Sequence, residues 1–92
     1  MLPGGSTNNA FRELNMPLFH FTTLGADGTV TPQIPYECVD REDAKEKARD
    51  LLSRLAATGV PNDSLNMLSV EIYDEGHQPL HEIRLVLEEI PK

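Results

Sequence analysis

Residues 68–87, LSVEIYDEGHQPLHEIRLVL, decide the fold because apolar and polar side chains alternate on both sides of a short polar stretch. The apolar positions are Leu68, Val70 and Ile72 before that stretch, and Ile83, Leu85 and Leu87 after it. A period of two places such side chains on one face of a strand. The pattern therefore predicts two half-buried strands that pair as a hairpin.

Parity constrains the connection between these strands, because a slip of one residue would turn every apolar side chain to the wrong face. Pairing Leu68 with Ile83 requires an even number of loop residues, and it places His81 opposite Val70, on the core side of the hairpin tip. An odd loop would scatter the apolar face. Two loops satisfy the condition, namely the four residues 74–77 and the two residues 75–76.

Residues 41–58, REDAKEKARDLLSRLAAT, are predicted to form one amphipathic helix. Asp40 can cap the first turn, and Gly59 followed by Pro61 ends the helix. One apolar stripe runs along it at helical spacing and comprises Ala44, Ala48, Leu51, Leu52 and Leu55. The alanines allow a close approach to a sheet, and the leucines fill a wider gap further along.

An earlier pair of strands precedes the helix. Residues 18–24, LFHFTTL, have the composition and alternation of a strand, and GADG at 25–28 is a turn in which Asp27 and Gly28 favour a hairpin. The return strand is expected over 30–34 and 36–39. Pro32 and Pro35 each remove a hydrogen-bond donor, so this strand should lie at the sheet edge, be irregular, or be broken in two.

These elements predict an α+β fold of order β-β-α-β-β, with one helix packed on one face of a single-layer, mostly antiparallel sheet of about four strands. Residues 1–15 lack periodicity and are rich in Gly, Ser and Asn, so we expect a flexible tail. Residues 16–92 should form a single small domain.

The composition argues against several partners. The chain has 92 residues and a net charge of −7, which repels both nucleic acid and anionic membranes. The basic residues of 41–54 alternate with acidic ones, as in the pairs Asp43/Lys47 and Asp50/Arg54, which is typical of a solvated helix face. A lone cysteine, Cys38, and the lack of a secretory or membrane-spanning pattern favour the cytoplasm.

The candidate chemistry rests on His77, His81 and Cys38. The two histidines lie four residues apart, which leaves them ~13 Å apart on an extended strand and unable to bind one ion together. Cys38 could pair with His20 or His81 as a thiolate and imidazole, but Arg41 is its nearest basic neighbour in the sequence. We therefore expect no catalytic residue, no cofactor, no metal site and no enzymatic activity.

One helix covers only one face of the sheet, and the other face is expected to be apolar enough to favour contact with a partner. Its residues would be Leu18, Met67, Tyr73, Leu80 and Val86 among Glu71, Glu82 and Arg84. Self-association through that face, or through the edge of the second strand, is the leading expectation for this small core.

Two functions follow from these patterns. The first is a protein-interaction module, either a homo-oligomer such as a dimer or a binder of a larger protein partner. An acidic nucleic-acid mimic that engages a toxin or a DNA-binding protein is one variant. The second is a domain that binds a small ligand or metal through His77, His81, Cys38 and nearby carboxylates.

Three motifs carry a resemblance. They are F-x-F at Phe19 and Phe21, Asp40 followed by Ala44 and Ala48, and D-x-x-x-x-P-L at 74–80. Together they resemble a family of short alphaproteobacterial proteins known as a domain of unknown function, over residues 16 to about 87. The resemblance implies no activity or cofactor.

The resemblance also bears on the ends and turns of the chain. The usual start of that family coincides with Met16-Pro17, so residues 1–15 would be an extension or a wrongly assigned start. Pro35-Tyr36 replaces the usual glycine turn before the helix. His77 occupies the position where the family's hairpin usually has glycine.

Overall fold

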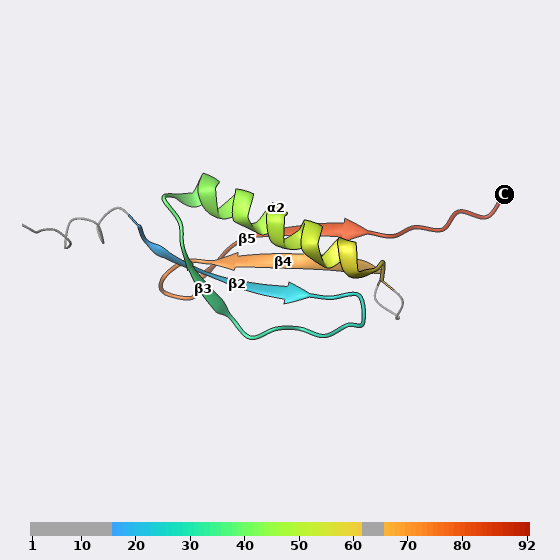
Figure 1. Cartoon of the computed structure of the whole chain (residues 1–92), viewed down its shortest axis with the longest axis horizontal. Coiled ribbons are helices and arrows are strands. Elements are labelled where there is room, and N and C mark those ends of the chain that lie inside the picture. The colour runs from blue at the N-terminus through green and yellow to red at the C-terminus, as the bar shows by residue number, and fades with distance from the viewer. Residues whose placement is uncertain (1–15, 62–65) are drawn as a thin grey trace, which may run out of the picture.

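The fold is a four-stranded sheet with one helix across one face (Figure 1). A computed structural model describes residues 16–61 and 66–92. The elements are β2 (Leu18–Leu24), β3 (Ile34–Glu37), α2 (Arg41–Thr58), β4 (Met67–Tyr73) and β5 (Pro79–Val86). The order across the sheet is β3-β2-β4-β5, with antiparallel neighbours. The α+β prediction is confirmed, whereas the tail predicted for 1–15 and part of the loop before β4 lie outside the described residues.

The helix α2 has the predicted bounds because both of its ends are encoded locally. The carboxylate of Asp40 accepts the N–H of Asp43 at 2.8 Å, which caps the first turn. At the other end Gly59 has a φ of 147° and donates its N–H to the carbonyl of Ala56. Ala44 and Ala48 are fully buried against the sheet, as their small side chains predict.

The core lies between α2 and the inner strands. Phe21, Val70 and Ile72 are fully buried there, and Leu51, Leu52 and Leu55 of α2 pack against them. The ring of Tyr36 lies edge-on to Phe21, with centroids 5.4 Å apart. The ammonium of Lys47 lies 4.2 Å from the centre of the Tyr36 ring. This cation–π contact helps to hold β3 against α2 and the core.

The first hairpin turns as predicted, but its return strand is broken. Gly28, with a φ of 84°, donates its N–H to the carbonyl of Gly25 at 3.0 Å. After an isolated bridge from Leu24 to Val30, regular pairing resumes only at β3. The strands expected over 30–34 and 36–39 were therefore wrong in their bounds, because the prolines leave only a short edge strand.

The second hairpin pairs two residues away from the predicted register. Leu68 lies opposite Leu85, and Ile72 lies opposite His81. The connection is a loop of odd length, residues 74–78, whereas parity predicts an even loop. A β-bulge beside Tyr73 adds one unpaired residue and restores the parity that the loop breaks.

The bulge also moves one side chain to the opposite face. Tyr73 pairs with Pro79, so Leu80 is the extra residue. Leu80 packs against the core beneath α2, not on the open face where it was expected. The prediction failed because alternation holds only while the ladder is regular.

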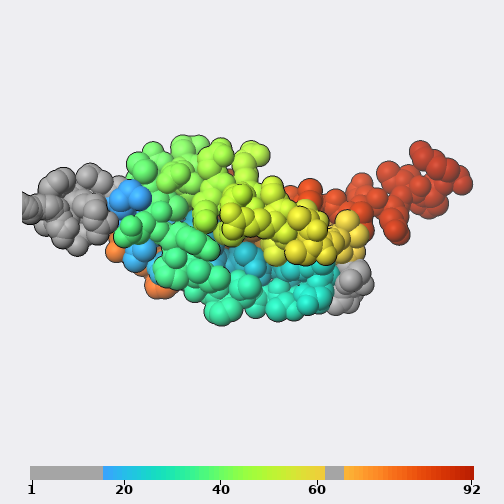
Figure 2. Space-filling view, viewed as in Figure 1, coloured from blue at the N-terminus to red at the C-terminus, as the bar shows by residue number. Residues whose placement is uncertain are grey.

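The residues after β5 extend beyond the body of the molecule (Figure 2). Ile90 in this segment is 67% exposed. Within the described ranges, no helix combines the length and apolar character needed to cross a bilayer.

Candidate functional site

The candidate site is the face of the sheet opposite α2, together with the outer edge of β5. The strand register assigns the members of this open face: Leu18, His20, Thr22 and Leu24 of β2, Met67, Ser69, Glu71 and Tyr73 of β4, and Glu82, Arg84 and Val86 of β5. Apart from Leu80, the predicted members do lie on this face. No helix or strand among residues 16–61 and 66–92 covers it, as Figure 1 shows, although Leu24 and Ser69 at one end of the face are buried.

A hydrogen-bonded cluster occupies the centre of the open face. One carboxylate oxygen of Glu71 accepts the hydroxyl of Tyr73 at 2.8 Å and the hydroxyl of Thr22 at 3.4 Å. The hydrogen bond to Glu71, and secondarily burial, raise the pKa of the Tyr73 phenol. A phenol with a raised pKa is a poor acid–base catalyst near neutral pH, so this cluster is suited to orienting side chains.

An ion pair lies beside this cluster on β5. The guanidinium Nε of Arg84 contacts the carboxylate of Glu82 at 2.9 Å. The hydrogen bond to Glu82 is the main cause of the raised pKa of Arg84. Glu82 also lies directly opposite Glu71, an unfavourable pairing of like charges that Arg84 partly offsets.

The histidines come together in a different combination from the one considered in the sequence. The rings of His20 and His77 stack with centroids 4.1 Å apart and planes 25° apart. The Nδ1 of His77 lies 2.6 Å from the side-chain oxygen of Gln33. His81 is exposed and pairs with Ile72, on the face that carries α2, whereas His20 belongs to the open face.

His77 also has an unusual backbone conformation, with a φ of 66°. This left-handed region favours glycine, which explains why the resemblance places a glycine at this position. The neighbouring Asp74 holds the turn by accepting the N–H of Gln78 on its carboxylate at 2.8 Å and the N–H of His77 on its carbonyl at 2.8 Å. The local hydrogen bonds therefore maintain this backbone conformation.

Cys38 is a core residue. Its side chain belongs to the cluster beneath α2 and is only 3% exposed. Burial, followed by the negative charge of Asp43, raises the pKa of the thiol. A thiol with a raised pKa is a weak nucleophile and a weak metal ligand.

The described parts of the chain contain no set of side chains that could form a metal centre. Within 16–61 and 66–92, no group of three or more His, Cys, Asp or Glu side chains is arranged to hold an ion.

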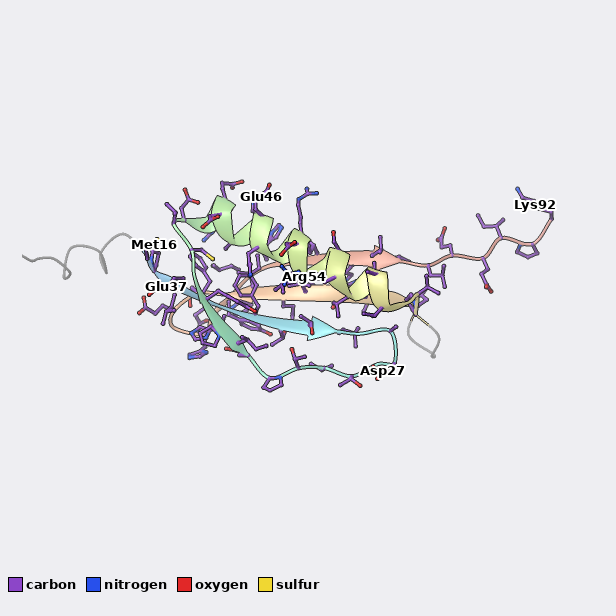
Figure 3. The ribbon with its side chains drawn as sticks, in the orientation of Figure 1. Met16, Asp27, Glu37, Glu46, Arg54 and Lys92 are labelled. Carbon is purple, nitrogen blue, oxygen red and sulfur yellow. The ribbon has the colours of Figure 1, made fainter. Side chains whose placement is uncertain are left out.

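Two cavities border the helix. One, of about 430 Å³, is lined mainly by the first turn and by Thr23, Thr31 and Leu55. Figure 3 shows Asp27 at this end of the sheet, far from Met16 and Glu37. The carboxylate of Asp27 accepts the N–H of Thr29, which lowers its pKa, so its role is to hold the turn.

The second cavity is smaller and mostly apolar. It measures about 90 Å³ and lies between the end of α2 and β5, against Val60, Leu85 and Val86. These three side chains are 62%, 48% and 54% exposed. Exposed apolar side chains therefore gather at the end of β5, while Val30, Ile34 and Val39 form a second exposed group in and beside β3.

Comparison with known proteins places the chain in one family. It belongs to the family described as Domain of unknown function (DUF6894), which matches residues 18–86. The resemblance noted in the sequence is thereby confirmed, and its alphaproteobacterial origin stays a prediction. No curated protein and no solved structure matches the chain.

Proposed function

We propose that this member of the DUF6894 family is a small non-enzymatic protein-interaction module that binds another protein through the open face and the adjoining edge of β5. The observation that carries the proposal is the one-sided sheet, in which α2 packs on one face and no described element packs on the other. When a partner removes the apolar side chains of a sheet face from water, their burial favours binding.

The side chains of the open face fit such a role. Leu18 and Met67 are half-buried near its two ends, and Glu71 at the centre is already hydrogen-bonded within the chain. A partner that covers the centre would therefore meet a carboxylate with one oxygen already hydrogen-bonded. Protein interfaces combine apolar side chains with polar groups whose hydrogen bonds are satisfied.

The chemistry of the site supports a binding role over a catalytic one. Tyr73 and Cys38 both have raised pKa values, which make them less reactive near neutral pH. His81 lies on the opposite face from His20, and Cys38 lies in the core. The alternative of a ligand or metal site built from His77, His81 and Cys38 therefore lacks convergent groups.

The setting and partner class follow from charge and cysteine content. A net charge of −7 disfavours nucleic acid and anionic membrane surfaces as partners. A free buried thiol such as Cys38 persists in the reducing cytoplasm, to which we assign the module.

The test compares Met67→Lys, a charge on the open face, with Glu46→Lys, the same new side chain on the outer surface of α2 (Figure 3). Association of the full chain would be measured by light scattering well above micromolar concentration, and by affinity capture from the native cell. We expect Met67→Lys to weaken binding at least about tenfold and Glu46→Lys to leave it unchanged. A monomer that captures no partner would reject the proposal, as would equal binding by both folded variants.

A further inference from the structure

The outer edge of β5 is the longest exposed edge of the sheet. It spans Pro79–Val86, whereas the opposite edge strand β3 spans only Ile34–Glu37. No described strand pairs with the outer side of β5. An open strand edge is a template for pairing with another chain.

One hydrogen bond shows which backbone groups of β5 face outward. The N–H of Leu87 donates to the carbonyl of Asn66 at 2.8 Å, directly beyond the last pair of the ladder. In an antiparallel pair the inward-facing residues alternate. Ile83 and Leu85 therefore direct their N–H and C=O groups to β4, and the outward-facing residues of β5 include Glu82, Arg84 and Val86.

A second copy of the chain could pair with this edge only in certain registers. Under two-fold symmetry, outward-facing residues must meet outward-facing residues. Centring the axis on Glu82 would set two carboxylates opposite each other, and centring it on Arg84 would set two guanidinium groups opposite each other. Centring it on Ile83 sets Glu82 of each copy opposite Arg84 of the other, which is the complementary arrangement.

We propose that two copies pair β5 against β5 about a two-fold axis at Ile83, so that two four-stranded sheets join into one of eight. This inference rests on the proposed function and names its partner as a second copy. In the single chain, Glu82 and Arg84 form an ion pair within one strand. The dimer would add two further Glu82–Arg84 pairs, each between the two copies.

The same register also brings side chains on the α2-bearing face of β5 together. Leu85, which is 48% exposed, would lie opposite His81 of the second copy. The two Ile83 side chains would meet at a non-hydrogen-bonded pair, where the Cα atoms are closest, at about 4.5 Å. The centre of β5 therefore gains both ladder hydrogen bonds and apolar contact.

Charge exchange provides the decisive test, performed on the full chain by sedimentation and light scattering. We expect Glu82→Arg alone and Arg84→Glu alone each to weaken dimerisation at least about tenfold, because like charges then face each other twice. The double exchange should restore the dimer. An equimolar mixture of the two single variants should form a mixed dimer, because every pair in it is complementary.

Cross-linking tests the position of the axis. Ile83→Cys should form a disulfide between copies on mild oxidation, and Arg84→Cys should not, because residue 84 lies opposite residue 82 of the other copy. Wild type is the control for Cys38, which is buried. Far-ultraviolet circular dichroism would confirm that each variant is folded.

The outcomes separate this inference from the proposed function. A monomeric wild type overturns the inference, while partner capture that is sensitive to Met67→Lys keeps the proposed function. A wild-type dimer that ignores both the charge exchange and the cross-link position overturns the β5 pairing alone. Loss in the single variants with recovery in the double variant and the mixture supports it.

Discussion

The two outer strands of the sheet differ in how they present their backbone. The N–H of Cys38 donates to the carbonyl of Pro17 at 3.1 Å, so alternation along β3 turns the backbone of Pro35 outward. Pro35 has no N–H, and the edge of β3 therefore lacks a donor where a new strand would need one. In β5 the outward-facing Glu82, Arg84 and Val86 all retain their donors. The edge of β3 is therefore blocked to a further strand, and the edge of β5 is open.

Proline substitutions at two neighbouring positions of β5 should differ in how much they destabilise the fold. Leu85 and Val86 are similarly exposed, but only the N–H of Leu85 faces β4. We expect Leu85→Pro to lower the free energy of unfolding by about 3 kcal/mol and Val86→Pro by far less. Urea denaturation under monomeric conditions measures both, and equal losses would contradict the assigned backbone direction.

The hydrogen bond at the centre of the open face should contribute the next largest effect. Tyr73→Phe removes the hydroxyl that donates to Glu71, which should cost about 1 kcal/mol at neutral pH because solvent screens part of the bond.

The stabilisation from this hydrogen bond should disappear at alkaline pH. The folded pKa of Tyr73 lies above its ordinary value of 10.0, so the stabilisation is fully present below pH 10 and is lost as the pH rises through the folded pKa. Urea denaturation of wild type and Tyr73→Phe should therefore converge at high pH. A gap that widens with pH would contradict the assignment.

Substitutions at His77, in the turn before β5, should change stability by a smaller amount that reports on backbone strain. His77→Ala and His77→Gly both remove the ring that stacks on His20, but only glycine accepts the φ of 66° without steric cost. We expect the glycine variant to be more stable than the alanine variant by about 0.5–1 kcal/mol. Thermal unfolding compares them, and a more stable alanine variant would show that the turn relaxes out of the left-handed region.

The turn before β3 should show the smallest effect, because Asp27 is fully exposed. Its pKa is lowered by the N–H of Thr29, so its stabilisation exists above the ordinary value of 3.8 and is lost as the pH falls through the folded pKa. Asp27→Ala should therefore be less stable than wild type near neutral pH and equal to it in acid. A difference that persists in acid would point to a role other than this hydrogen bond.

Much of the fold was predictable from short segments. The bounds of α2 and of β2 were predicted as observed, since Asp40, Gly59 and the spacing of Ala44 and Ala48 act within a few residues. The edge position of β3 was also predicted, because Pro35 is incompatible with an inner strand. Its bounds were not, because Pro32 and Pro35 predict an interrupted strand without fixing where regular pairing resumes.

The candidate site was predictable in membership but not in geometry. The alternation in residues 68–87 placed Tyr73, Glu71 and Val86 on one face, and Leu80 was wrong because a bulge is not encoded in a repeating pattern. The contact of His20 with His77 could not be anticipated either. It depends on β2 lying beside β4, which brings together residues far apart in the chain.

The sequence by itself determined the helix, the first strand and the one-sided apolar pattern, because periodicity, caps and prolines act over a few residues. Only the tertiary structure decided the register of β4 with β5, the bulge that buries Leu80, and the outward direction of Glu82 and Arg84. These features depend on packing between distant segments, in which a shift of two residues preserves the apolar pattern but changes every neighbour.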